Sequence, residues 1–213
     1  MACFGTFSDR NSAIEKLILI GAGGHAKVVL ETALSVPVDV IGFLDDSPQA
    51  RLGSLPHLGS LPNFVPSRGI KAVLAIGLNH TRQVLSKSFA EDLEWQSVVS
   101  RHAVCSQSIS IGVGTVVFAG AIVQADTSLG DHVILNTGCR VDHDVVIADF
   151  CHVAPGAILT GGVVLEEGVF VGAGAVVLPG VRVGAWSTLG AGAVVTKDVP
   201  SGAVFVGVPA RPL

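Results

Sequence analysis

Residues 111–146 read IGVGTV VFAGAI VQADTS LGDHVI LNTGCR VDHDVV, and the same six-residue pattern continues to Pro200. Each block opens with Ile, Val or Leu, and the residue four places later is small or β-branched. The residue before that one is most often glycine, which supplies a positive φ at a corner without a Cβ penalty. The 90 residues from 111 to 200 form fifteen such blocks without an insertion. This hexapeptide period predicts a parallel β-helix with three blocks in each coil of 18 residues.

The block openers predict the core of this β-helix. Because residues 18 apart stack on one another, the openers form apolar columns that run along the prism. One such column contains Val117, Leu135, Val153, Val171 and Leu189. The last coil leaves an open β edge, which a cap or a partner must cover.

The repeat occupies less than half of the 213 residues, so we expect a second domain. We predict a mobile tail at 1–15, a Rossmann-like nucleotide-sugar-binding domain at 16–100, and a β-helix domain with a C-terminal tail at 101–213. A formal charge of −4 argues against a nucleic-acid partner. No apolar run approaches the roughly 20 residues of a membrane span. No secretory signal is visible, and we therefore expect a cytoplasmic protein.

The cysteines indicate core positions rather than a disulfide or a metal site. None of the four, Cys3, Cys105, Cys139 and Cys151, forms a C-x-x-C pair. Cys139 and Cys151 occupy the small inward position of their blocks and lie on different walls. We expect them to behave as small buried hydrophobes.

The N-terminal part alternates short aliphatic runs with helical segments. This order predicts a small open parallel sheet with right-handed crossovers. The expected strands are 17–20, 38–44, 72–76 and a fourth at 96–99, and the expected helices are 26–34 and 81–93. Gly21-Ala22-Gly23-Gly24-His25 then forms a glycine-rich turn between the first strand and the first helix.

Such a turn presents backbone amides and a positive helix end to a phosphate. The carboxyl ends of the strands share one edge of the sheet, which we call the rim. We expect the rim to bind the substrate through Gly23, Gly24, His25, Asp45, Asp46 and Asn79. Three interpretations of the turn remain open: a nucleotide-sugar site, an NAD site, or a purely structural turn. For His25, a polar helix start is a further alternative.

Polar residues interrupt the repeat between Asn136 and Thr160, and this cluster indicates a site. His143 shares its column with Ala125, Gly161 and Pro179, so its ring has open space. We hypothesise that His143 is a general base, because its ordinary pKa near 6.5 suits proton transfer at neutral pH. Asp144 would orient the imidazole. The alternatives are an exposed corner histidine, and an aspartate that only fills the left-handed corner position.

A histidine metal site is not expected. His132, His143 and His152 belong to three different columns, whereas a zinc site needs converging ligands. His132 instead shares a column with Phe150 and Trp186, which indicates an outer aromatic stack.

Together these motifs resemble the NeuD/PglD-type sugar acyltransferases. The resemblance rests on the glycine-rich turn, Gly-Phe-Leu-Asp-Asp, Ile-Gly-Leu-Asn, and coils that carry Val-Asp-His-Asp and Cys-His-Val-Ala-Pro-Gly. It implies a left-handed β-helix, a homotrimer with active sites between subunits, and acetyl-CoA as cosubstrate. It also implies an N-acetyltransferase for the 4-amino group of a nucleotide-linked 4-amino-4,6-dideoxy sugar, such as GDP-perosamine or a UDP-linked bacillosamine precursor.

The same resemblance implies the cosubstrate site. Asn136 and His152 would contact acetyl-CoA or support the base, and the Gly161 amide would face the thioester carbonyl. Pro209 and Arg211 would lie near the adenine. A purely structural role for His152 remains open. Two alternative functions also remain: a sugar O-acetyltransferase of the sialic acid type, and a non-enzymatic scaffold or metal-dependent β-helix protein.

Overall fold

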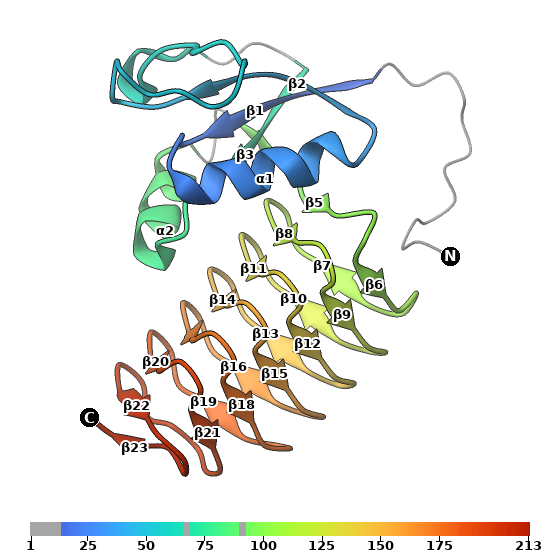
Figure 1. Cartoon of the computed structure of the whole chain (residues 1–213), viewed down its shortest axis with the longest axis vertical. Helices are drawn as coiled ribbons and strands as arrows, with labels where there is room; N and C mark the ends of the chain where they lie inside the picture. Colours follow the sequence, from blue (N-terminus) through green and yellow to red (C-terminus); the bar gives the residue numbers. More distant parts are fainter. Residues whose placement is uncertain (1–13, 66–68, 90–92) are drawn as a thin grey trace.

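The computed structural model describes residues 14–65, 69–89 and 93–213. The chain forms a small α/β domain seated on one end of a parallel β-helix (Figure 1). Most of the tail predicted at 1–15 lies outside the described residues, and Glu15 begins the first strand. Neither α-helix among the described residues has the length and apolar character needed to cross a bilayer.

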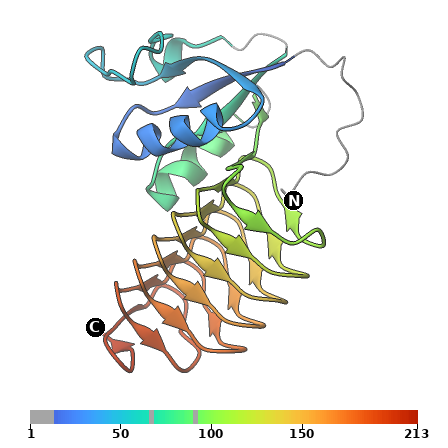
Figure 2. The same ribbon diagram turned by 45° about the vertical axis from the view of Figure 1, so that its right-hand side comes forward.

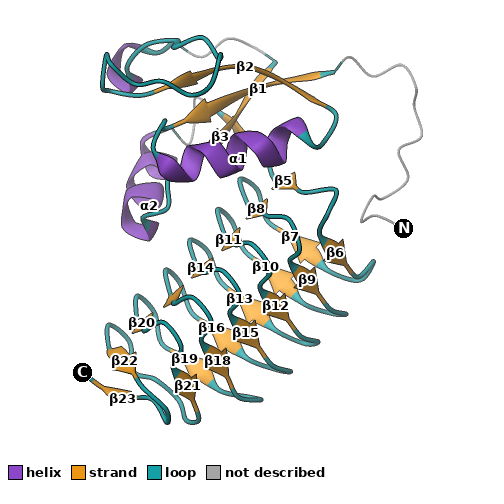
Figure 3. Cartoon of the chain, in the orientation of Figure 1, coloured by secondary structure: helices purple, strands orange, loops and turns teal. Residues whose placement is uncertain are grey.

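The N-terminal domain is an open parallel sheet, as predicted. Its sheet order is β2-β1-β3-β4, and every pairing is parallel. The elements in chain order are β1 (Glu15–Ile20), α1 (Gly24–Leu34), β2 (Val38–Leu44), the 3-10 helix η1 (Leu61–Asn63), β3 (Ile70–Leu74), α2 (Asn79–Ser88) and β4 (Glu94–Trp95). Helix α1 lies between this sheet and the β-helix (Figure 3), because its buried face packs on Val98, Val116 and Ile134.

The fourth strand was predicted wrongly. It is Glu94–Trp95, whereas Val98–Val99 pairs with Val116–Val117 in the β-helix. The chain leaves the sheet at Ser97, whose hydroxyl donates to the Gly112 carbonyl at 2.6 Å. Helix α2 begins two residues before the predicted start and ends at Ser88, five residues before the predicted end.

The β-helix has three walls of short parallel strands, stacked in the turned view of Figure 2. The first wall contains β5 (Val98–Val99), β8 (Val116–Val117), β11 (Ile134–Leu135), β14 (His152–Val153), β17 (Phe170–Val171), β20 (Thr188–Leu189) and β22 (Val204–Val206), closed by antiparallel β23 (Arg211–Pro212). The second wall contains β6 (Val104–Cys105), β9 (Ile122–Val123), β12 (Arg140–Val141), β15 (Ile158–Leu159), β18 (Val176–Val177) and β21 (Val194–Val195). The third wall contains β7 (Ser110–Ile111), β10 (Ser128–Leu129), β13 (Val146–Ile147), β16 (Val164–Leu165) and β19 (Arg182–Val183).

The register of these walls confirms the period and the core. Residues 18 apart are paired partners, as in Leu135 with Val153. The predicted column of openers is fully buried, with 0% exposure at Val117, Leu135, Val153, Val171 and Leu189. Cys139 and Cys151 are also fully buried, and burial raises the pKa of each thiol to about 12. Cys3 lies outside the described residues.

The corner between the third and first walls, called the third corner below, carries the outer aromatic stack. The rings of His132 and Phe150 are parallel, with centroids 5.4 Å apart. The N-terminal domain packs on this corner, since Trp95 meets His132 edge-on at 4.9 Å and His80 meets Trp186 at 5.4 Å. The stack is therefore part of the junction between the two domains.

Candidate functional site

His143 lies at the second corner, between the second and third walls, on the turn from β12 to β13. Its Nδ1 is 2.7 Å from Asp144 Oδ2, and the two side chains are 61% and 65% exposed. Asp144 has a φ of 58°, so it also fills the left-handed corner position. The Asp144 carboxylate therefore contacts the imidazole from a left-handed corner position, and this geometry is compatible with both sequence interpretations of Asp144.

The acidic neighbours set the protonation of His143. The hydrogen bond that His143 donates to Asp144, and then the charge of Asp142, raise the pKa of His143 above its ordinary 6.5. A carboxylate only accepts hydrogen bonds, so the neutral ring carries its proton on Nδ1. The Nε2 lone pair is left to accept a proton from a substrate.

Gly161 gives the imidazole its space. A Cβ at this position would lie 2.7 Å from Cε1 and 2.8 Å from Nε2 of His143, closer than side-chain atoms approach. Among the described residues, no acceptor receives a hydrogen bond from the Gly161 amide. The ring therefore covers a glycine whose N–H can serve a ligand.

His152 lies in a buried hydrogen-bonded network on the first wall. Its Nδ1 is 3.2 Å from the Gly77 carbonyl and its Nε2 is 3.0 Å from Asn136 Nδ2. Since the carbonyl only accepts, Nδ1 donates to Gly77 and Nε2 accepts from the Asn136 amide. Burial, and then the charge of Arg82, lower the pKa of His152 to about 3. His152 is therefore neutral, and both of its ring nitrogens have partners.

His25 approaches this network from the first turn of α1. Its ring centroid is 5.3 Å from that of Phe118 and 6.0 Å from that of His152. Burial, and then Arg82, lower its pKa to about 4. The buried Nε2 of His25 has no hydrogen-bond partner in the part of the chain that the structure describes. An orphaned nitrogen of this kind indicates a missing partner, such as a ligand or a water molecule.

Among the other predicted rim residues, the two glycines are exposed, and the two aspartates accept hydrogen bonds from backbone amides. Gly23 and Gly24 are exposed, and a Cβ at either would contact nothing within 4 Å. Asp45 holds the glycine-rich turn, since its carboxylate accepts from the Ala22 amide and the Ser47 amide, each at 2.9 Å. Asp46 accepts from the Leu61 amide at 3.0 Å and is exposed.

Asn79, by contrast, points to the β-helix. Its Nδ2 donates to the carbonyls of Gly168 and Val169 at 3.0 and 3.2 Å. Its buried Oδ1 has no partner within the described ranges. Asn79, which begins α2 at the rim, thus also links the N-terminal domain to the β-helix through its side-chain amide.

Arg82 is a residue that the sequence did not single out, as are Lys197 and Phe205 of the pocket described below. It is 1% exposed, and its guanidinium donates to backbone carbonyls of both domains. A signal was present, because Leu85 and Phe89 lie three and seven residues later on the same buried face of the helical pattern. A cation on an apolar stripe of a helix requires a partner.

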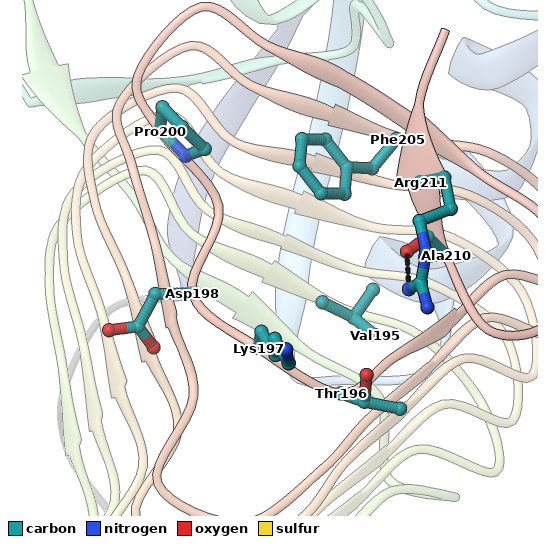
Figure 4. A pocket seen from close by; sticks show the side chains of 8 residues that line it. All are labelled: Val195, Thr196, Lys197, Asp198, Pro200, Phe205, Ala210 and Arg211. Carbon is teal, nitrogen blue, oxygen red and sulfur yellow. Dashed lines mark hydrogen bonds between the residues drawn. The ribbon is translucent and has the colours of Figure 1, made fainter.

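A pocket of about 380 Å³ lies at the C-terminal end of the β-helix (Figure 4). Lys197 and Arg211 line it together with the ring of Phe205, and Pro209 is two residues before Arg211. Arg211 Nη1 donates to the Ala210 carbonyl at 2.8 Å. Asp198 also lines the pocket, so two cations and one carboxylate surround the aromatic ring. A pocket with this lining can bind a phosphate group or a planar base.

Among the described residues, no cluster of three or more His, Cys, Asp or Glu side chains could hold a metal ion. Residues 16–89 match the PglD N-terminal domain, and residues 162–197 match the bacterial transferase hexapeptide model of six repeats. The chain is 39% identical to the acetyltransferase domain of PglB from Neisseria gonorrhoeae, over 93% of this chain and 100% of that one, with a TM-score of 0.89. It is 37% identical to PerB, the perosamine N-acetyltransferase of Caulobacter crescentus, over 94% and 98% of the two chains, also with a TM-score of 0.89. The chain belongs to this family of sugar N-acetyltransferases.

The family relation extends to a more distant structure. This chain is also 28% identical to WeeI from Acinetobacter baumannii, over 92% of this chain and 99% of that one, with a TM-score of 0.80. An uncharacterised protein of Acanthamoeba polyphaga mimivirus is 29% identical over 100 residues, and the chain spans 20% of its length. The PglB domain has been solved with acetyl coenzyme A, and PerB with CoA and GDP-perosamine. This enzyme is accordingly an acetyl-CoA-dependent sugar N-acetyltransferase with a left-handed β-helix, as the family resemblance implied.

The structure of the acetyltransferase brings its predicted site residues together in three places. The second corner holds His143, Asp144 and Gly161. The junction joins His25, Asn79, Asn136 and His152. The C-terminal pocket has Arg211 in its lining. Within one chain the second corner is apart from the junction, because the N-terminal domain packs on the first wall and the third corner.

Proposed function

We propose that the enzyme acetylates the 4-amino group of a nucleotide-linked 4-amino-4,6-dideoxy sugar, of the GDP-perosamine or UDP-linked bacillosamine type. The observation that carries this proposal is the pairing of His143 with Asp144 on an exposed corner. The complex of PerB with CoA and GDP-perosamine supports the acceptor class.

In the proposed reaction, the neutral sugar amine attacks the thioester carbonyl carbon of acetyl-CoA. Nε2 of His143 takes the proton that the amine loses as the C–N bond forms, while Asp144 holds the Nδ1 proton. The C–S bond then breaks, and the proton on His143 passes to the departing thiolate of CoA. The Gly161 amide donates to the carbonyl oxygen, where negative charge develops.

The nucleotide sugar would bind to the domain of residues 16–100. Helix α1 has Gly23 at its N-cap and no capping side chain, so its first amides are open to a diphosphate. Asp45 shapes the turn, and the remaining acceptor of Asp46 would hydrogen-bond to the nucleoside. His25 and Asn79 would place the sugar, since each has a buried polar atom without a partner among the described residues.

Acetyl-CoA would bind along the β-helix domain of residues 101–213. The thioester end belongs near Gly161 and the junction of Asn136 and His152. The adenosine end fits the C-terminal pocket, where Lys197 and Arg211 offer two cations to its phosphates. Pro209 would border the adenine.

We further infer a homotrimer with active sites between subunits. In one chain His143 stands on a corner that its own rim does not reach, so a second copy must bring a base to the rim. Apolar side chains of the second wall support this arrangement, with Val104 64% exposed. A cytoplasmic location agrees with acetyl-CoA and nucleotide sugars as substrates.

The decisive experiment is an acceptor panel with acetyl-CoA, read out by release of the CoA thiol. GDP-, UDP- and dTDP-linked 4-amino sugars are compared with the matched 4-hydroxy sugars and with free sialic acid. We expect turnover of an amino sugar at least a hundredfold above that of its hydroxy counterpart. Turnover of hydroxyl acceptors alone would replace this proposal with O-acetylation, and thiol release without any acceptor dependence would contradict both.

A further inference from the structure

Arg82, the fourth residue of α2, is a buried cation surrounded by carbonyl oxygens. Nε donates to His132 at 3.1 Å, and Nη2 donates to Phe150 at 2.8 Å and to Cys151 at 3.2 Å. Nη1 donates to Gly77 at 3.0 Å and to Ile76 at 3.3 Å. None of the ion pairs found among the described residues includes this guanidinium.

The carbonyls around Arg82 come from both domains. Ile76 and Gly77 follow β3 and end at the rim. His132, Phe150 and Cys151 belong to the third corner in two successive coils of the β-helix, beside α2 (Figure 1). One planar side chain therefore sets the position of the β3 end relative to two coils.

Stability alone does not explain a cation at this position. Burial lowers the pKa of Arg82 to about 10, so the side chain is still charged at neutral pH. A buried charge without a counter-ion is costly, and apolar substitutes at such positions are often neutral or stabilising. What an apolar side chain cannot supply is the fixed fork of donors that holds several carbonyls in one geometry.

The carbonyl of Gly77 connects Arg82 to the predicted site. It accepts from Arg82 Nη1 and also from His152 Nδ1. His152 in turn accepts from the Asn136 amide. The ring of His25 lies against Gly77, since a Cβ on that glycine would be 3.7 Å from His25 Cγ. Arg82 thus holds the backbone against which His25 and His152 are placed.

We propose that Arg82 is a positioning residue, which sets the rim against the β-helix so that the bound sugar amine reaches acetyl-CoA in the reacting geometry. This role rests on the proposed function, because it assigns the nucleotide to the rim and acetyl-CoA to the β-helix. It requires no contact between Arg82 and either substrate. It affects the alignment of the two substrates and not the affinity of either alone.

The test uses Arg82→Lys and Arg82→Met in the full-length enzyme, with Arg182→Met as the matched control. Arg182 is an exposed arginine on β19, and its guanidinium pairs with the Glu166 carboxylate at 3.0 Å, within the β-helix. Binding of GDP, UDP and CoA is measured by calorimetry, and turnover is measured with the nucleotide-linked amino sugar and with the same amino sugar lacking the nucleotide.

For Arg82→Lys we expect CoA and nucleotide affinities within twofold of the wild type and turnover of the nucleotide-linked sugar at least tenfold lower. Turnover of the free amino sugar, which has no diphosphate for the glycine-rich turn to hold, falls less than threefold. Arg82→Met shows the same pattern with a larger loss, and Arg182→Met shows none of it.

Three results would overturn the role. Wild-type turnover in Arg82→Lys would show that the hydrogen bonds from the Arg82 guanidinium to the surrounding carbonyls do not align the substrates. Equal losses of turnover with the nucleotide-linked and the free amino sugar would mean that Arg82 affects the acetyl-transfer step itself and not the alignment of the nucleotide sugar. A loss of CoA affinity would mean that Arg82 only maintains the fold. A wild-type enzyme that acetylates no nucleotide-linked sugar contradicts the proposed function instead, and the comparison is then made with the acceptor that the panel identifies.

Discussion

Two imidazoles on the same β-helix have opposite protonation behaviour. His143 is exposed on the second corner and hydrogen-bonded to a carboxylate, which raises its pKa. His152 is 8% exposed on the first wall, and burial lowers its pKa to about 3. The surroundings, and not the residue type, decide which histidine can exchange a proton near neutral pH.

The hydrogen-bond partners show the same difference. Both nitrogens of His152 have protein partners, the Gly77 carbonyl and the Asn136 amide. Among the described residues, the ring of His143 has one hydrogen-bond partner, Asp144, and its Nε2 is open. A ring with two protein partners holds structure together, whereas a ring with one open nitrogen can act as a base. Four predictions test this contrast.

The largest expected effect is on turnover in His143→Asn. We expect kcat to fall by about two orders of magnitude or more, because the proton acceptor is lost. The melting temperature stays the same, since the side chain is exposed. His102→Asn, another exposed corner histidine, is the control and keeps full activity. If a folded His143→Asn enzyme keeps activity within threefold of the wild type, His143 is not the general base.

The second effect concerns the space over Gly161. Gly161→Ala puts a methyl group 2.7 Å from the ring of His143 and displaces it, so we expect kcat to fall about tenfold. Steady-state kinetics of the single and double variants measure the coupling. If the alanine acts through the imidazole, adding it to His143→Asn causes no further loss. Additive losses would mean that Gly161 acts on its own.

A smaller effect is expected on the pH profile of Asp144→Asn. Asp144 raises the pKa of His143, so its removal lowers that pKa, and the acidic limb of kcat/KM moves to lower pH. The plateau falls severalfold as the ring loses its orientation. Asp126→Asn is the matched control, because Asp126 has the same φ of 58° one coil earlier. An unchanged acidic limb in Asp144→Asn would leave Asp144 as a turn residue only.

The fourth prediction concerns the stability of the fold in acid and not turnover. The pKa values of His25, His132 and His152 are lowered to about 4, 4 and 3. Between pH 6.5 and 4 the unfolded chain therefore binds more protons, and stability falls as the pH falls through this window. Each histidine contributes a slope of at most about 1.4 kcal/mol per pH unit.

Urea titrations at pH 7, 6 and 5 measure this slope. His152→Gln, which can donate and accept as the imidazole does, should reduce it. His143→Asn should not reduce it, because a raised pKa contributes stability at low pH that is lost as the pH rises through the folded value. The same slope in His152→Gln and wild type would mean that His152 becomes protonated without unfolding.

The β-helix and its corner residues could be predicted, because they depend on the spacing of residues along one segment of the chain. The six-residue period specifies which side chains point inward, so Leu135 and Val153 are core residues before any contact is known. The polar interruption at His143 and the small residue at Gly161 stand 18 positions apart, and a fixed period turns that separation into contact. Turn chemistry likewise predicted a left-handed corner at Asp144.

The junction could not be predicted in the same way. Arg82 binds carbonyls 50 and 68 residues away, and backbone carbonyls carry no signature in a sequence. Nothing local shows that Asn79 faces the β-helix, or that Val98 leaves the sheet for the first wall. The sequence by itself determined the repeat, its core and the corner histidine, because each follows from spacing along one chain segment. Only the tertiary structure decided how the two domains meet, because that depends on hydrogen bonds to main-chain groups that any residue could offer.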